Sequence, residues 1–163
     1  MAGLTDVIAY ILKNYPDKSD LSNARVTKLV YLSDWRHAIT YKSQITNINW
    51  YFDNFGPFVW DIKRTAEISS DLFVIHHSSN AYGNPKLLIG LRREDYIPEL
   101  SENERKSIDH VIDKTKDLIW SQFIRLVYST HPIVSSNRYS YLDLVEKAEE
   151  YLKYRNKTVK ETC

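Results

Sequence analysis

The chain has 163 residues, and its 22 Lys and Arg against 21 Asp and Glu give a formal net charge of +1. A chain so close to neutral has no overall field that attracts nucleic acid or anionic lipid, so neither is expected as its main partner. Its 43% hydrophobic content is typical of a globular protein, and its single cysteine, Cys163, excludes an internal disulfide framework and any Cys-x-x-Cys metal or redox motif.

The N-terminal part of the chain predicts two helices. Residues 4–13 carry apolar side chains at helical spacing. Residues 22–39 form the longest helical candidate, with Ser22 or Asn23 able to cap its start. The apolar side chains of this second segment cover most of its circumference, which is typical of a central helix surrounded by other elements.

The next segment predicts a strand that leads into a helix. Residues 46–55 are rich in aromatic side chains and end in the turn signal Asn54-Phe55-Gly56-Pro57. Because the missing N–H of proline would be unpaired in the first turn of a helix anyway, we predict that Pro57 begins a helix that runs to about residue 68.

The rest of the chain predicts one β-hairpin and three further helices. Two apolar runs joined by a polar segment rich in Asn, Gly and Ser predict the hairpin over residues 72–91. The helices are predicted over residues 101–118, 121–128 and 140–152, and Ser101 with Glu104 forms a capping box. The basic residues from about 153 to 163 are expected to form a frayed tail. Together these elements predict a mainly α fold: a single compact helical domain over residues 1–163 with a small β-hairpin or sheet insertion.

The sequence also carries expectations about location. Its longest apolar run is far shorter than the roughly 20 residues that a membrane-spanning helix needs. The N-terminus lacks the basic cluster of a signal peptide, since Asp6 is the first charged residue. We therefore expect a cytoplasmic protein.

Patterns for enzyme chemistry are weak. None of the four glycines has the spacing of a phosphate-binding loop, and none of the five histidines has the spacing of a local metal-ligand pair. Arg105 and His110 match the spacing of helical ribonucleases, in which His acts as general acid–base and Arg contacts a phosphate. Arg125 and His131 fit the same pattern, which shows how permissive it is. We expect no enzyme activity, no cofactor and no metal, and keep a ribonuclease that uses Arg105 and His110 as an alternative.

The aromatic segment 50–60 is the strongest local feature. In a strand, alternation buries either Trp50 and Phe52 or Tyr51, but not all three. Six aromatics in so short a stretch can hardly all be internal, so some should form an exposed surface for a protein partner. The six are Trp50, Tyr51, Phe52, Phe55, Phe58 and Trp60.

Three motifs in a fixed order carry a resemblance to a known family. The first is Lys28-Leu29-Val30-Tyr31-Leu32-Ser33-Asp34, the second is the extended segment 45–60 with Phe55-Gly56-Pro57, and the third is Ser129-Thr130-His131-Pro132. Together, over about residues 4–152, they resemble the Panacea antitoxin domain, which is also described as a phage-associated protein family.

The resemblance implies a mainly helical fold with a small β insertion and a function by binding. It implies an antitoxin of a toxin–antitoxin system, with a role in phage defence, that neutralises a cognate toxin by direct protein–protein interaction. One related member is thought to deliver its toxin to a protease, so a proteolytic adaptor stays open as an alternative.

The resemblance also suggests roles for particular residues. We expect Tyr51, Asn54, Phe55 and Trp60 to contact the toxin. Lys28, Tyr31 and Asp34 are expected to brace the extended segment against the long helix, while Gly56 and Pro57 set its exit angle. Thr130 and His131 form the late motif of the family.

Overall fold

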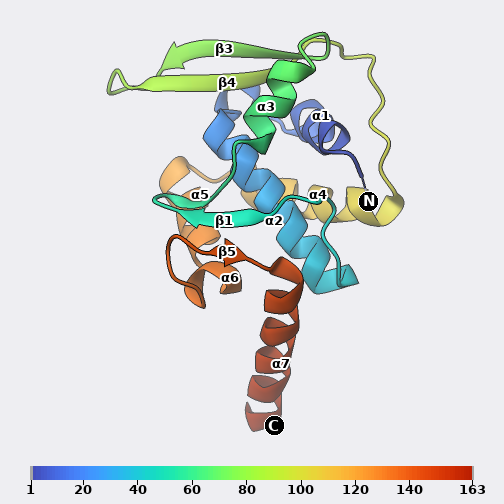
Figure 1. Cartoon of the computed structure of the whole chain (residues 1–163), viewed down its shortest axis with the longest axis vertical. Coiled ribbons are helices and arrows are strands. Elements are labelled where there is room, and N and C mark those ends of the chain that lie inside the picture. The colour runs from blue at the N-terminus through green and yellow to red at the C-terminus, as the bar shows by residue number, and fades with distance from the viewer. Residues whose placement is uncertain (1, 163) are drawn as a thin grey trace.

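The computed structural model describes residues 2–162 (Figure 1). The helices are α1 (Leu4–Asn14), the short 3-10 helix η1 (Lys18–Asp20), α2 (Asn23–Tyr41), α3 (Asp61–Ile68), α4 (Glu102–Thr115), α5 (Trp120–Tyr128), α6 (His131–Val134) and α7 (Leu144–Thr162). The strands are β1 (Trp50–Asp53), β2 (Gly56–Phe58), β3 (Phe73–Ser79), β4 (Pro85–Leu91) and β5 (Tyr141–Leu142). The fold is therefore mainly α with small antiparallel sheets, as predicted.

Helix α2 runs through the middle of the molecule, as its all-round apolar pattern predicts (Figure 1). It contacts α1, α3, α4, α7 and strands of both sheets. The Ser22 side chain caps its start by accepting a hydrogen bond from the Arg25 N–H at 3.1 Å. Several of its buried residues are polar or charged, among them Arg25, Lys28 and Asp34. A central helix therefore carries both the core and the polar contacts that position its neighbours.

The sheet content exceeds the single hairpin that the sequence predicts. A three-stranded antiparallel sheet has the order β2-β1-β5, and β3 pairs with β4 in a separate hairpin, which is the predicted one. Pro57 does not start a helix: it lies in β2, opposite Phe52. Because β2 is an edge strand, a residue without an N–H is tolerated there, and α3 begins only at Asp61. Gly56, with φ of 101°, supplies the backbone conformation that closes the turn between β1 and β2.

The C-terminal third differs from prediction in its boundaries. The capping box of Ser101 and Glu104 is present at the start of α4, and α5 begins at Trp120, one residue before the expected Ser121. Ser140 does not cap the last helix, because residues 141–142 form β5 and the Asp143 side chain accepts from the Glu146 N–H at 3.1 Å.

The expected frayed tail is helical as far as the structure describes it. Helix α7 continues to Thr162 and extends away from the other elements in Figure 1, while Cys163 lies outside the described residues. The sequence from residue 144 onward contains no Gly or Pro and many Glu, Lys and Leu residues, which have high helix propensity. Helix propagation therefore continues past the packed part of the chain.

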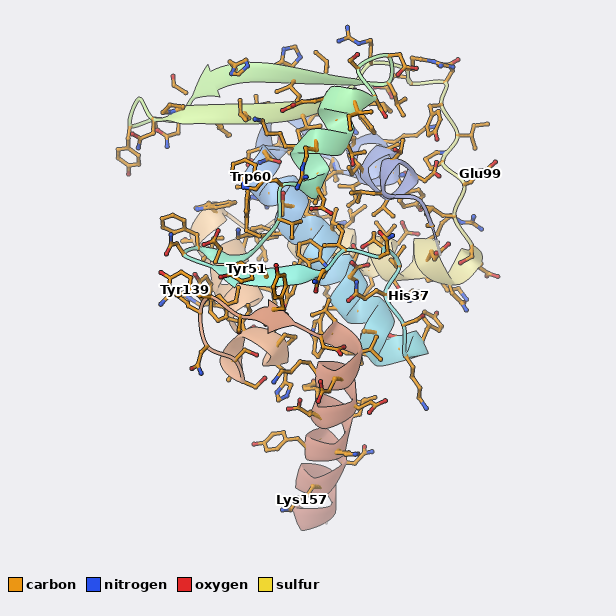
Figure 2. The ribbon with its side chains drawn as sticks, viewed as in Figure 1. His37, Tyr51, Trp60, Glu99, Tyr139 and Lys157 are labelled. Atoms are coloured by element: carbon orange, nitrogen blue, oxygen red, sulfur yellow. The ribbon has the colours of Figure 1, made fainter. Side chains whose placement is uncertain are left out.

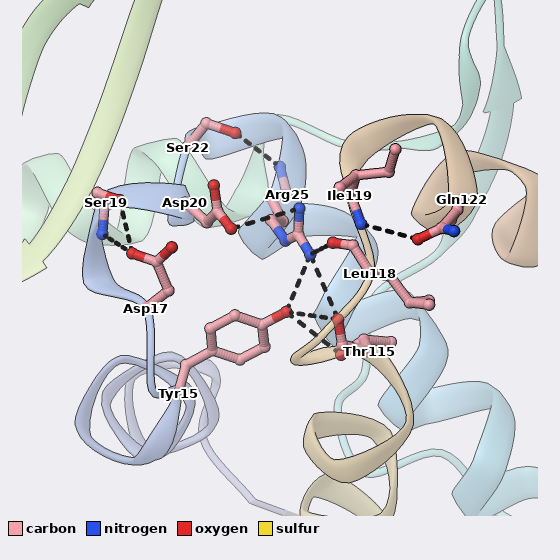
Figure 3. Close-up of polar contacts among 10 residues, drawn as sticks. All are labelled: Tyr15, Asp17, Ser19, Asp20, Ser22, Arg25, Thr115, Leu118, Ile119 and Gln122. Atoms are coloured by element: carbon pink, nitrogen blue, oxygen red, sulfur yellow. Dashed lines mark hydrogen bonds and ion pairs between the residues drawn. The ribbon is translucent and has the colours of Figure 1, made fainter.

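Arg25 connects the first turn of α2 to the end of α4 and the start of α5 (Figure 3). Its Nη2 donates to the Tyr15 hydroxyl at 3.1 Å, to the Leu118 carbonyl at 3.0 Å and to the Thr115 carbonyl at 3.4 Å. Its guanidinium carbon lies 4.5 Å from the centre of the Phe123 ring. One buried cation thus supplies a donor to the Leu118 carbonyl and adds to the donors that the Thr115 carbonyl already has in the Leu118 N–H and the Tyr15 hydroxyl.

Replacing Arg25 with methionine is expected to lower the free energy of unfolding by about 2 kcal/mol, because the Leu118 carbonyl and the Tyr15 hydroxyl lose a buried hydrogen-bond donor while the apolar stem is kept. Urea denaturation measures the change. The matched control is Arg64→Met, since Arg64 is exposed and pairs only with Asp61 at 3.7 Å; it should stay within about 0.5 kcal/mol of the parent. Equal effects at the two positions would contradict this account of Arg25.

Candidate functional site

Asp34 holds the extended segment that leads into β1. Its Oδ1 accepts hydrogen bonds from the backbone N–H groups of Ile45 and Thr46, both at 2.9 Å. Its Oδ2 accepts from the Thr46 hydroxyl at 2.6 Å and from the Trp50 indole N–H at 2.9 Å. The carboxylate is fully buried. One side chain of α2 therefore sets where β1 begins and which way Trp50 points.

Burial makes the charge of Asp34 sensitive to pH. Loss of hydration raises the pKa of its carboxyl to about 6, although the hydrogen bonds from Thr46, Trp50 and Ile45 act in the opposite direction. The folded state thus holds this proton more tightly than the unfolded chain does. The contribution of Asp34 protonation to stability is complete below the ordinary pKa of 3.8 and is lost as the pH rises through about 6.

The titration of Asp34 should be visible in the resonances of its donors. We expect the indole N–H of Trp50 and the amide of Thr46 to shift together with a midpoint near pH 6 in a ¹⁵N-resolved NMR titration, since both donate to this carboxylate. The indole of Trp60, which lies on the surface, serves as the control and should not follow this midpoint. Resonances of Trp50 and Thr46 that stay constant from pH 8 to pH 4 would contradict the expectation.

Tyr31 and Lys28 contact the same extended segment one and two turns earlier on α2. The Tyr31 ring meets the Trp50 ring edge-on, with centroids 5.5 Å apart, and its hydroxyl is hydrogen-bonded to the Thr130 hydroxyl at 2.8 Å. The Lys28 ammonium lies 5.9 Å from the centre of the Phe58 ring. Burial lowers the pKa of Lys28 to about 8, while the Asp53 carboxylate acts in the opposite direction. The three motif residues of α2 thus face successive parts of segment 45–58.

The late motif, Thr130 and His131, contacts both α2 and α7. Thr130 pairs with Tyr31, and the His131 ring lies 5.9 Å from the ring of Tyr151 on α7. The Nε2 atom of His131 lies 3.6 Å from a carboxylate oxygen of Glu150. Thr130 and His131 therefore connect α2 to α7 through the short helix α6.

The structure places three of the four expected contact residues together. Tyr51, Asn54 and Phe55 lie on β1 and its turn, and Phe55 is 80% exposed. Two tyrosines from the distant β5 region join them: the rings of Tyr51 and Tyr141 are 5.1 Å apart, and the Tyr139 hydroxyl donates to Asn54 Oδ1. Figure 2 shows Tyr51 and Tyr139 on the same side of the molecule. We call these five residues the hairpin surface.

The sequence analysis does not identify Tyr139 and Tyr141 as surface residues, because β5 is only two residues long. A strand so short has no alternating pattern to reveal it, and its partner lies about ninety positions earlier. The Tyr-Ser-Tyr spacing at 139–141 does not reveal them either, because Tyr139 has a left-handed φ of 67° and lies outside the strand.

Trp60 does not belong to the hairpin surface. It lies just before α3, packs edge-on against Phe58 at 5.0 Å between centroids, and is 55% exposed. In Figure 2 it lies closer to the β3–β4 hairpin than Tyr51 and Tyr139 do. It lines a groove of about 860 Å³ that also includes Tyr82, Ile119 and Trp120. The four expected contact residues therefore divide between two surfaces.

The structure does not assemble the Arg105 and His110 pair. The two are five positions apart on α4, so they project about 140° apart around the helix. The Arg105 guanidinium donates to the Leu100 carbonyl at 2.6 Å, and burial together with the charges of Arg36 and Lys114 lowers the pKa of His110. Neither lines the groove beside Trp60 or a smaller one of about 490 Å³ beside His37.

The part of the chain that the structure describes, residues 2–162, holds neither a metal-binding cluster nor a membrane-spanning helix. No three His, Cys, Asp or Glu side chains of this range gather as a metal ion would require. None of the helices within it is long and apolar enough to cross a bilayer.

Comparison with known proteins returns one family. The family model described as "Antitoxin SocA-like, Panacea domain" matches residues 26–132, about two thirds of the chain. The matched range contains all of the α2 motif, the β1–β2 hairpin and the Thr130-His131 element, and it excludes α1 and α7. No curated protein and no solved structure matches the chain significantly.

Proposed function

Because the chain belongs to the SocA-like antitoxin family of Panacea domains, we propose that it is a non-enzymatic antitoxin that neutralises a cognate toxin by direct protein–protein contact. We further propose that residues 1–163 act as one domain in the cytoplasm and that the hairpin surface contacts the toxin. The observation that carries the proposal is this surface, in which Phe55 on the β1–β2 turn and Tyr139 and Tyr141 beside it are exposed, while the buried Asp34 fixes the start of β1 through Trp50.

The chemistry of the hairpin surface fits a protein partner. Phe55 offers an exposed apolar ring, while Tyr139 and Tyr141 each combine an aromatic ring with a hydroxyl that hydrogen-bonds. Tyrosine and other aromatics supply most of the binding free energy at the centres of protein interfaces. Within the turn, residues 53–56, the one charged side chain is the Asp53 carboxylate, which repels a polyanion; the nearby cation Arg138 lies over the Phe52 ring, at 5.8 Å from its centre.

Rigid support matters because ordering a flexible loop on binding reduces affinity. Here the backbone of β1 is paired on both sides, to β2 and to β5. Trp50 and Phe52 point inward and are buried, while Tyr51 between them points outward. The aromatic side chains therefore need little rearrangement to engage a partner.

The test is rescue of growth. The product of the neighbouring reading frame is expressed from an inducible promoter with and without this chain, and colony formation and the level of the tagged toxin are measured. We expect loss of growth with the toxin alone and rescue with this chain, at an unchanged toxin level. Rescue with a shortened toxin half-life would identify a proteolytic adaptor instead, and failure to rescue or to co-purify would contradict the proposal.

A further inference from the structure

The groove beside Trp60 is a second surface with the features of a binding site. It lies between the segment that leads into α2, the tip of the β3–β4 hairpin and the turn between α4 and α5. We call it the tryptophan groove, with Trp60, Tyr82, Ile119 and Trp120 among its walls and Asn23 and Arg25 also lining it. Its volume of about 860 Å³ falls in the range of sites that hold drug-sized ligands or short peptide segments.

The walls of the groove expose large apolar side chains to solvent. Tyr82 is 90% exposed, and Trp60, Ile119 and Trp120 are each about half exposed or more. Four such side chains around one hollow are unusual on a surface without a partner. The indole N–H groups of Trp60 and Trp120 donate no hydrogen bond to any residue in the described range 2–162. The walls therefore offer apolar area and unused donors together.

Two of the groove's buried residues carry polar atoms without partners. Asn23, which is 9% exposed, has a side-chain oxygen with no hydrogen-bond partner among residues 2–162. The Nε–H of Arg25, whose Nη2 is fully engaged, likewise has none in that range. The first is an acceptor and the second is a donor, and a peptide group supplies both complementary functions in one unit. Both atoms are shielded from solvent, however, so an occupant of the groove does not contact them directly.

The charges around the groove favour a neutral occupant. Three acidic and three basic residues line it, so they cancel in formal charge: Asp17, Asp20, Asp117, Arg25, Lys86 and Lys116. Arg25 is also buried and already hydrogen-bonded to Tyr15 and Leu118. A polyphosphate or a nucleic-acid strand would gain little here, since such ligands need an excess of cations.

We propose that the tryptophan groove binds a neutral, apolar peptide segment of the toxin, with one large apolar side chain packed against Trp60 and Trp120. The peptide groups on either side accept from the indole N–H groups of Trp60 and Trp120. The inference rests on the proposed function only in assigning the bound peptide segment to the toxin. Trp60 packs directly on Phe58 of β2, so the groove and the hairpin surface adjoin along the chain.

The groove is tested first without the toxin. A random library of twelve-residue peptides is displayed on phage and selected against the full chain, and the enriched peptides are measured by calorimetry. We expect peptides with a large apolar residue and a net charge near zero, whose affinity falls at least tenfold in Trp120→Ala. Tyr82→Ala, on an exposed loop tip, provides a second variant that leaves packing intact. Ile68→Ala is the matched control, because Ile68 is 82% exposed and does not line the groove.

Several results would overturn the inference. Enriched peptides that are strongly charged, or that bind the Trp120→Ala and Tyr82→Ala variants as tightly as the parent, would do so. A twelve-nucleotide single-stranded RNA that shifts the indole resonances of Trp60 and Trp120 would identify a nucleic-acid site instead.

The same variants separate this inference from the proposed function. If the toxin binds the chain, and Phe55→Ala weakens binding while Trp120→Ala and Tyr82→Ala do not, the proposed function stands and the groove inference fails. If the selected peptides need the groove but the toxin is neither bound nor neutralised, the assignment of the segment to a toxin fails together with the proposed function. If toxin affinity falls in Phe55→Ala and also in Trp120→Ala and Tyr82→Ala, the result supports both the proposed function and the groove inference.

Discussion

Replacing Asp34 with alanine is expected to lower the free energy of unfolding by about 3–5 kcal/mol, the largest effect of any single substitution considered. Besides a longer bond from the Gln44 side-chain amide at 3.4 Å, the change removes the acceptor of four hydrogen bonds, those from the N–H groups of Ile45 and Thr46, the Thr46 hydroxyl and the Trp50 indole. These donors are buried and have no route to water, so their loss is not compensated by hydration. Urea denaturation followed by far-UV circular dichroism measures the change.

Two variants sharpen this prediction. Asp34→Asn keeps the shape of the side chain but turns an amide N–H₂ toward donors, so it should also destabilise strongly. Asp71→Ala, at an exposed aspartate, is the control and should stay within about 0.5 kcal/mol of the parent. An Asp34→Ala protein that unfolds within about 1 kcal/mol of the parent would show that segment 45–50 is held by apolar packing alone.

The second large effect is expected in toxin binding. Replacing Phe55 with alanine should weaken the affinity for the toxin by roughly thirtyfold or more, which corresponds to about 2 kcal/mol and is typical of an aromatic anchor at an interface centre. Because Phe55 is 80% exposed, its loss should leave the melting temperature unchanged. Calorimetry with the purified toxin measures the affinity, and Tyr141→Ala should show an effect in the same direction.

The control for this prediction is Ile97→Ala. Ile97 is 79% exposed, like Phe55, but lies in the segment between β4 and α4, far from β1 in Figure 1. Its replacement should leave the affinity within twofold of the parent. Equal losses at Phe55 and Ile97, or no loss at Phe55, would remove the hairpin surface from the interface.

The helices could be predicted because their signals are local. The periodicity of α1 and α2 and the reciprocal cap of Ser101 and Glu104 depend on residues only a few positions apart. The three-stranded sheet could not be predicted, because β5 pairs with a strand about ninety residues away and has no alternating pattern of its own. Pro57 shows how a local rule fails: proline suits the start of a helix and an edge strand equally, and tertiary pairing decides between them.

The candidate site could be predicted only in part. Alternation in β1 predicts that Trp50 and Phe52 share one face and Tyr51 the other, but not which face is buried; the structure buries Trp50 and Phe52. That Asp34 accepts from Trp50 requires the fold of segment 45–50 around α2, which no periodicity encodes. The tryptophan groove is built from four separate segments, so its residues share no spacing in the sequence. Trp60 could be identified as an exposed aromatic, but its separation from Phe55 depends on where α3 begins.

Amide hydrogen exchange of the chain, alone and with saturating toxin, tests the central claim most directly. Binding through the hairpin surface predicts new protection at the β1–β2 turn, residues 53–56, where Asn54 and Phe55 of that surface are exposed. Protection confined to α4 near Arg105 and His110, or no change anywhere while the toxin is bound, would contradict recognition through this surface.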